Sequence, residues 1–249
     1  MSIRSRLTLL ALPLFLAGCP WPWSGSSKPF DIRAVVVTVP DQPQATVTLS
    51  WDRYADASIY NVSRRDAGGP AQLVRTLSDL RYTESVARGA TISYSVAALA
   101  SNGETKGTSP EKFLVAPTGV GISAVTDVAV EDASASTAPL VVSSSTPAIR
   151  WSAAPGANAY HVRVSESTDP RGEKPIFAVF TSATSVTVGK DQPLPGLDLT
   201  GYPQAAGSIS QGRNYLVSIT ALRADSANLS SASAFDLVPM ANPVKLAYF

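Results

Sequence analysis

Cysteine and histidine, the side chains used most often as strong nucleophiles, general bases and zinc ligands, are almost absent from this chain. Its 249 residues include one cysteine, Cys19, and one histidine, His161. A hydrolase of the triad type needs a histidine beside its nucleophile, and no Gly-x-Ser-x-Gly motif is present to supply a serine. His161 follows Tyr160 in a strand pattern, so an inward Tyr160 would turn His161 toward solvent. We therefore expect no catalytic residue and predict that the protein is not an enzyme.

Metal and cofactor motifs are also missing from the sequence. The usual zinc sets need several cysteines and histidines, and the chain has one of each. Asp127, Glu131 and Asp132 lack the Asp-x-Asp-x-Asp-Gly spacing of a calcium loop and are typical of a solvated strand end. The glycines of 119–124 mimic a dinucleotide-binding loop, but 125–130 reads as a strand where that loop requires a helix. We expect neither a metal nor a cofactor.

Cys19 closes a short apolar run near the start of the chain. Arg4 and Arg6 precede the run, which begins at Leu7 and is only about ten residues long, whereas a spanning helix needs about twenty. A basic start, a short apolar core and small residues before a cut site are typical of a secretory signal peptide. The sequence Leu-Ala-Gly-Cys at 16–19 resembles the lipobox of bacterial lipoproteins.

The resemblance implies that residues 1–18 are removed as a signal peptide and that Cys19 is lipidated. Each buried methylene of an acyl chain contributes roughly 0.8 kcal/mol, so several chains would anchor the protein permanently. Residues 19–29 would form a short tether whose tryptophans either rest at the lipid headgroups or belong to a stiff proline-rich spacer. Pro20 replaces the aspartate that signals inner-membrane retention in enteric-type sorting. We expect a bacterial envelope protein at the outer membrane or cell surface.

Composition bounds the remaining partners and the fold class. Without residues 1–18, which hold two arginines, 18 basic side chains stand against 19 acidic ones, a formal net charge of −1. A protein with this charge balance has no excess of basic residues for binding nucleic acid. Ser, Thr, Val, Pro and Gly are abundant and long helical patterns are missing. Such a composition favours an all-β fold with many short strands.

An internal repeat predicts two domains. The two copies lie 100 residues apart and have identical spacing: Trp51, Tyr60 and Val62 in the first, and Trp151, Tyr160 and Val162 in the second. This period is that of a whole domain and is too long for a solenoid repeat. The pattern resembles the fibronectin type III domain, in which a core tryptophan is followed by a strand that opens with Tyr-x-Val. The second copy also has the Pro-Gly turn of that family at 155–156.

The resemblance implies two tandem fibronectin type III or immunoglobulin-like β-sandwiches, domain 1 at 30–117 and domain 2 at 118–249. Tyr215, which opens an alternating Tyr-x-Val-x-Ile pattern, would form the tyrosine corner of domain 2. In domain 1 the equivalent position is Ile92 and the tyrosine moves to Tyr94, an inward position. We therefore expect domain 1 to lack the corner bond.

Domain 2 contains an inserted loop at about 189–212, rich in proline and glycine. A loop of this length in a compact domain is uncommon and is often functional. Its large side chains could pack back onto the sandwich, which we favour, or bind a partner: Leu194, Leu197, Leu199 and Tyr202.

Two classes of function fit these observations. One is a non-catalytic, membrane-anchored envelope lipoprotein that acts as a structural spacer or a protein-binding module. The alternative is a module for extracellular polysaccharide, which would need exposed aromatic residues in a row on domain 2; Tyr202, with Tyr54 or Tyr82, offers thin support. A fold of this kind does not choose between them.

Overall fold

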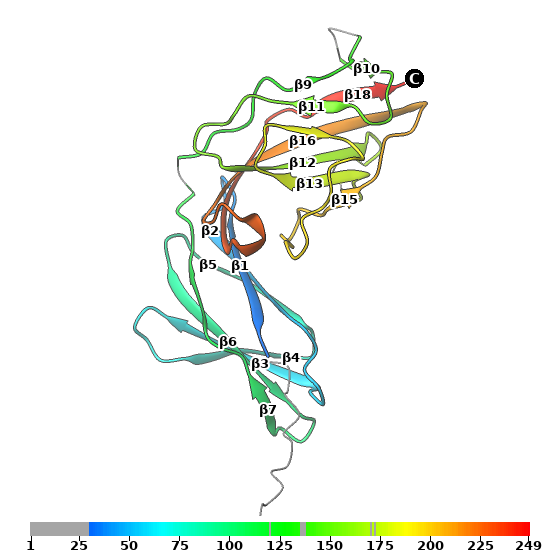
Figure 1. Ribbon diagram of the computed structural model, residues 1–249. Coiled ribbons are helices and arrows are strands. Elements are labelled where there is room, and N and C mark those ends of the chain that lie inside the picture. Colours follow the sequence, from blue (N-terminus) through cyan, green and yellow to red (C-terminus); the bar gives the residue numbers. More distant parts are fainter. Residues whose placement is uncertain (1–29, 120, 135–137, 170, 172) are drawn as a thin grey trace, which may run out of the picture.

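The computed structural model describes residues 30–249, except 120, 135–137, 170 and 172. The signal peptide, Cys19 and the tether fall outside these residues. The described chain folds into two β-sandwich lobes stacked end to end, with a single short 3₁₀ turn, η1 (Leu229–Ser231), as its helical element (Figure 1). The fold class is therefore all-β, as the composition predicts.

Domain 1 contains two facing sheets. One sheet has the order β1-β2-β5, and the other has the order β4-β3-β6, with β7 and β8 both paired to β6. The strands are β1 (Ile32–Thr38), β2 (Gln44–Trp51), β3 (Ile59–Asp66), β4 (Gln72–Leu77), β5 (Arg81–Ala87), β6 (Thr91–Leu99), β7 (Thr105–Thr108) and β8 (Lys112–Val115). This order is that of a fibronectin type III-like sandwich.

The last strand of domain 1 is divided into β7 and β8, with Pro110 between them. Pro110 has no N–H to donate to the neighbouring strand. Ser109 maintains the contact, because its N–H donates to the Val96 carbonyl at 2.9 Å and its hydroxyl accepts from the Val96 N–H at 3.0 Å. The division is thus a local consequence of proline chemistry.

Domain 2 has a larger sheet and a smaller one. The larger sheet contains β15-β13-β12-β16, and β16 also pairs with β17 and β18; the smaller has the order β14-β11-β9, and β10 runs parallel to β18. The strands are β9 (Ala129–Val130), β10 (Leu140–Val142), β11 (Ala148–Arg150), β12 (Ala159–Glu166), β13 (Phe177–Thr181), β14 (Ser185–Thr187), β15 (Ala205–Ala206), β16 (Arg213–Ala224), β17 (Ala234–Pro239) and β18 (Val244–Tyr248).

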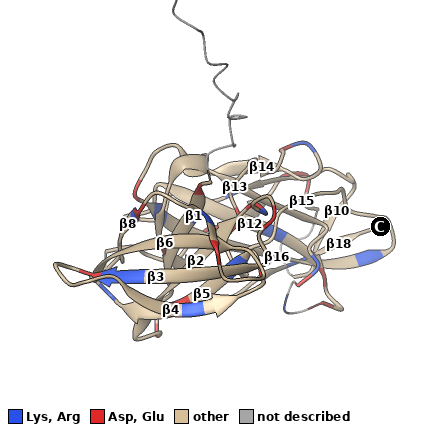
Figure 2. Ribbon diagram, turned by 90° about the horizontal axis from the view of Figure 1, so that it is seen from below, with Lys and Arg blue, Asp and Glu red and all other residues tan. Residues whose placement is uncertain are grey.

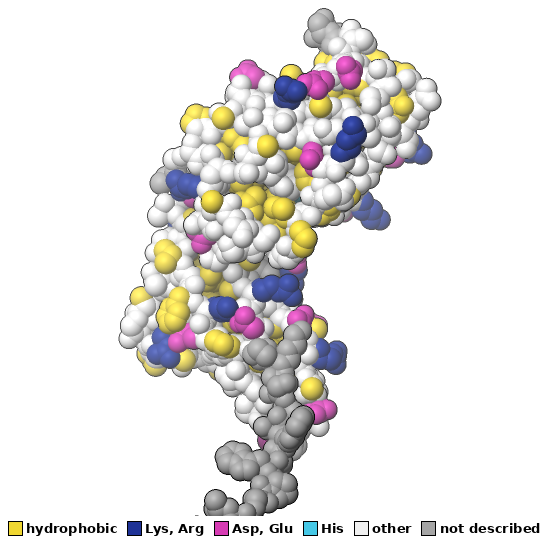
Figure 3. All heavy atoms as spheres, in the orientation of Figure 1, with side chains coloured by type: hydrophobic (Ala, Val, Ile, Leu, Met, Phe, Trp, Pro, Cys, Tyr) yellow, Lys and Arg dark blue, Asp and Glu magenta, His cyan; other side chains and the backbone are white. Residues whose placement is uncertain are grey.

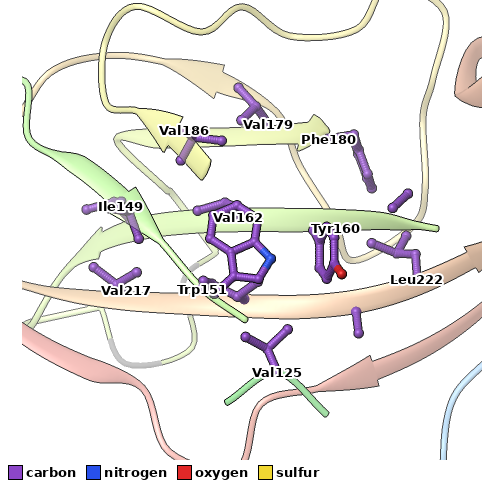
Figure 4. Close-up of a cluster of buried hydrophobic side chains, with 14 of the residues drawn as sticks. Val125, Ile149, Trp151, Tyr160, Val162, Val179, Phe180, Val186, Val217 and Leu222 are labelled. Carbon is purple, nitrogen blue, oxygen red and sulfur yellow. The ribbon is translucent and has the colours of Figure 1, made fainter. Parts of the chain in front are cut away.

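The repeated motif occupies equivalent core positions in the two domains. Trp51 is 4% exposed and Trp151 is 5% exposed, and each ring packs against the tyrosine nine residues later, with centroid distances of 5.5 and 5.2 Å. The hydroxyl of Tyr60 accepts the N–H of Tyr54, and that of Tyr160 accepts the N–H of the equivalent residue, both at 3.1 Å. Figure 4 shows Trp151 and Tyr160 surrounded by aliphatic side chains from both sheets of domain 2. The predicted core role of both tryptophans is confirmed.

The tyrosine corner is present in domain 2 alone, as predicted. The Tyr215 hydroxyl donates to the Ser210 carbonyl at 3.1 Å and accepts the Ser210 N–H at 2.7 Å. In domain 1 Ile92 is buried, and the fully buried Tyr94 instead donates its hydroxyl to Glu84. Burial, together with the hydrogen bond to Glu84, raises the pKa of the Tyr94 hydroxyl. The two domains therefore use tyrosine in different ways to hold the same strand.

Candidate functional site at the domain junction

One continuous sheet passes from domain 2 into domain 1. β17 pairs with β1 in parallel, with Val36 opposite Ala234 and Thr38 opposite Asp236. The Val36 N–H donates to the Ser233 carbonyl at 2.7 Å. The order β13-β12-β16-β17-β1-β2-β5 therefore crosses both lobes, and the junction is made by backbone hydrogen bonds (Figure 1).

β1 is buried from both sides at this junction. Val36 belongs to the core of domain 1, while Val35, Val37 and Val39 pack against the core of domain 2. A strand that is covered on both faces reads as a continuous apolar run. The consecutive valines at 35–37 thus match two-sided burial, whereas the alternation of Val35, Val37 and Val39 by itself predicts a strand with one buried face.

The linker between the domains is fixed to domain 1 by Arg88. Its guanidinium donates to the carbonyls of Val39, at 2.6 Å, and Thr118, at 3.4 Å. Thr38 also donates its hydroxyl to the Pro117 carbonyl at 3.3 Å. On the domain 2 side, a Cβ at Gly156 would lie 1.8 Å from the Gly121 carbonyl oxygen, so the close approach of the linker requires glycine there.

An ion pair with a buried carboxylate joins β16 and β17 at the junction. The Asp236 side chain is 3% exposed, and its Oδ2 accepts from the Arg223 guanidinium, with Nε at 3.1 Å. The Arg223 side chain is 38% exposed, so it is the removal of Arg223 that would leave an uncompensated buried charge, on Asp236, which is strongly destabilising. The pair therefore constrains the register of β17, the strand that continues into domain 1.

The inserted loop 189–212 packs onto domain 2. Leu197 and Leu199 are buried in its hydrophobic core, and Leu194 and Tyr202 pack against that core in partly buried positions. Gln204 ties the loop together, because its side-chain amide donates to the Leu194 and Leu197 carbonyls at 3.0 and 2.8 Å. The burial of Leu197 and Leu199 fits the packing alternative, and these two side chains are not accessible to a partner in this conformation.

His161 does not point to solvent, and that prediction is wrong. The side chain projects from the outer face of β12, as expected, but the inserted loop covers that face, so His161 is only 2% exposed. Its Nε2–H donates to the Pro203 carbonyl at 2.9 Å, and its ring packs against Phe180 and Tyr202 at 4.6 and 5.4 Å. Burial lowers the pKa of His161 to about 4, which keeps the ring neutral at physiological pH.

The loop also reaches across the junction to domain 1. Arg81 of β5 donates to Asp198 at 2.8 Å and to the Thr200 hydroxyl at 2.5 Å. The Thr200 hydroxyl also lies 3.2 Å from that of Thr48 on β2. These contacts bring together residues more than 100 positions apart, and no sequence pattern singled them out.

An exposed apolar pair lies on the other side of the junction. Phe113 is 70% exposed and Val115 is 61% exposed, and both border a groove of about 690 Å³ between β8 and the β16–β17 region. In Figure 3, hydrophobic side chains gather near the waist between the lobes, whereas Figure 2 shows acidic and basic residues interspersed over the strands. The surface has no strongly single-signed region in these views.

The described residues contain no group of three or more His, Cys, Asp or Glu residues placed to hold a metal ion. Within the same part of the chain, no helix is long and apolar enough to cross a membrane. Cys19, the predicted site of lipid attachment, lies outside the described residues, so its modification stays a prediction.

The sheet order and the Tyr215 corner define a tandem β-sandwich protein of fibronectin type III-like fold. Among solved structures, the chain is similar to an Fn3-like protein from Clostridium thermocellum, with 30% identity, covering 36% of this chain and 93% of that one, at a TM-score of 0.29. It is also similar to the FN1–FN3 domains of chicken CNTN1 (15% identity, 85% and 62% coverage, TM-score 0.36). A cytokine receptor complex matches at 14% identity, 86% and 95% coverage and a TM-score of 0.31. No protein-family model and no curated protein matches the sequence.

Proposed function

We propose that this protein is a non-catalytic, lipid-anchored lipoprotein of the bacterial envelope whose two sandwiches act as a rigid spacer. The observation that carries the proposal is the continuous sheet through β17 and β1. Domains joined by a short linker ordinarily move relative to each other unless their interface is extensive and apolar. Here the backbone pairing, the valines of β1 and the Arg88 contacts to the linker all oppose such motion.

The positions of the chain ends support a spacer. β1 begins at the end of domain 1 remote from domain 2, and the C-terminus lies on domain 2, at the far end of the molecule (Figure 1). A lipid on Cys19 would thus hold domain 1 next to the membrane and present domain 2 at a set distance from it. The outer membrane or the cell surface is the location that Pro20 favours.

Replacing Cys19 by serine tests the anchor, because serine lacks the sulfur nucleophile that receives the lipid. We expect the variant to lose palmitate labelling and to appear as a soluble or uncleaved precursor. Membrane fractionation and metabolic labelling with palmitate measure both properties. Unchanged fractionation together with unchanged labelling would overturn the anchor.

The rigidity of the junction can be measured by electron–electron double resonance in the Cys19→Ser background, which is free of other cysteines. Spin labels on cysteines introduced at Asn102 and Ser182 report on domains 1 and 2. We expect one narrow distance distribution. Val37→Asp, which places a carboxylate against the core of domain 2, should broaden it.

Leu73→Asp is the matched control, because Leu73 is an exposed aliphatic residue of domain 1 and should tolerate the charge. A broad distribution in the chain that retains Val37 would contradict the rigid spacer. An unchanged distribution in Val37→Asp would show that β1 does not contribute to it.

A protein-binding role is the second candidate, and Phe113 and Val115 favour it. An exposed apolar pair beside a groove is typical of a contact surface for another protein. Polysaccharide binding by a row of exposed aromatic residues has less support, because the residues considered for it, Tyr54, Tyr82 and Tyr202, are all partly buried and offer no open stacking surface.

A further inference from the structure

A second cleft, of about 430 Å³, opens where the inserted loop meets domain 1. Arg81 of β5 forms one wall. The remaining lining comes from domain 2: Arg163 of β12, Arg171 and Glu173 after β12, and loop residues 198–201 and 203. The volume lies in the range of small-molecule sites, roughly 300–1,000 Å³. The cleft is therefore large enough for more than a single ion.

The two acidic residues of this cleft are already engaged by arginines. Asp198 accepts from Arg81 at 2.8 Å, and Glu173 lies 3.8 Å from Arg171. Arg163 is the remaining charged residue of the cleft; its backbone is paired in β12, and no side chain or carbonyl among the described residues forms an ion pair or a hydrogen bond with its guanidinium. The cleft thus carries one uncompensated positive charge.

Arg163 is held in place by its strand and is half-buried. It lies two residues after His161 and on the same outer face of β12. Its positive charge helps to keep the neighbouring His161 neutral, so the histidine does not compete for an anion. A guanidinium that is partly removed from water without an anionic partner loses solvation that an incoming oxyanion would replace.

We propose that this cleft binds an acidic saccharide, with Arg163 holding its carboxylate, sulfate or phosphate group. The planar guanidinium fork matches such a group bidentately, which gives strong, oriented hydrogen bonds. Thr200 and Arg81 line the same cleft and are hydrogen-bonded to each other; the N–H groups of Arg81 that these bonds leave over and the hydroxyl hydrogen of Thr200 are the donors available to a sugar ring. This site requires neither the lipid anchor nor the spacer role, so it stands or fails separately from them.

Calorimetric titration of the full chain in detergent tests the proposal with three probes: tetragalacturonate, a neutral tetrasaccharide and inorganic phosphate. We expect saturable binding of tetragalacturonate that weakens with salt, no binding of the neutral sugar, and far weaker binding of phosphate. Arg163→Gln should weaken tetragalacturonate binding at least tenfold, and Arg163→Lys should restore part of it because the charge returns without the fork.

The matched control is Arg75→Gln, on the exposed face of β4 and outside the cleft, which should leave affinity unchanged. A thermal melt of Arg163→Gln equal to that of the parent shows that the fold is intact. Absence of tetragalacturonate binding, equal binding of the neutral sugar, or an unaltered affinity in Arg163→Gln would each overturn the site. If phosphate bound as tightly as tetragalacturonate, the cleft would be a simple anion site and the proposal of a saccharide ligand would be wrong.

Discussion

Replacing Trp151 by alanine should lower the free energy of unfolding of domain 2 by about 3–5 kcal/mol, the usual cost of truncating a large core aromatic. Trp151 is nearly fully buried, and its ring meets Tyr160 edge-on at an interplanar angle of 69°. The backbone N–H of Trp151 donates to the Thr184 carbonyl at 3.1 Å, so the backbone would hold the truncated residue over a cavity. Figure 4 shows that this cavity would be lined by Ile149, Val162 and Val217 among others.

Urea denaturation followed by far-ultraviolet circular dichroism measures this loss without relying on the fluorescence of the deleted residue. Trp151→Phe is the matched control and should cost much less, because the ring is retained and the indole N–H is buried without a hydrogen-bond acceptor. A loss well below 3 kcal/mol for Trp151→Ala would mean that the core position of the repeat is not as described.

Acidification should destabilise domain 2 through His161. The folded pKa of about 4 lies below the ordinary value of 6.5, so the unfolded chain takes up the proton first as the pH falls. The stability contributed by neutral His161 is therefore fully present above about pH 6.5 and decreases from there down to about pH 4. The difference of two to three units between the unfolded and folded pKa of His161 corresponds to a loss of about 3 kcal/mol in the free energy of unfolding over this pH range.

The inserted loop should respond first, because it supplies the Pro203 carbonyl and the Tyr202 ring that enclose His161. Hydrogen exchange of residues 189–212 at pH 7, 6, 5 and 4 should show progressive loss of protection, and urea melts at the same pH values should give the loss of stability. Asp198 and Thr200 link this loop to domain 1, so its release would also remove those contacts with Arg81.

His161→Gln is the control for this pH effect, because its amide can donate to the Pro203 carbonyl but does not titrate. The difference in the free energy of unfolding between the parent protein and His161→Gln should shrink as the pH falls from 6.5 to 4. Titration of carboxylates cancels in this difference because both proteins contain the same ones. If the free energies of unfolding of the parent and the variant changed in parallel with pH, His161 could not be buried in its neutral form.

Much of the fold could be predicted from residues whose spacing repeats. The motif at Trp51 and Trp151 marked the same core position twice, and Tyr215 marked the corner of one domain while Ile92 marked its loss in the other. These features depend on side chains only a few positions apart on regular strands, where alternation decides which face is buried. The loop was also visible as an insertion, although its packing was left between two alternatives.

The all-β class and the tandem repeat can be read from the sequence alone, because alternation and turn residues act locally. It also contains the Leu-Ala-Gly-Cys motif that predicts the anchor. Three features are visible only in the folded chain: β17 pairs with β1, the loop covers His161, and Arg81 and Arg163 line the same cleft. These contacts join residues far apart in the chain. They form because the loop packs onto domain 2 and the two domains pack together, and no local sequence pattern encodes either event.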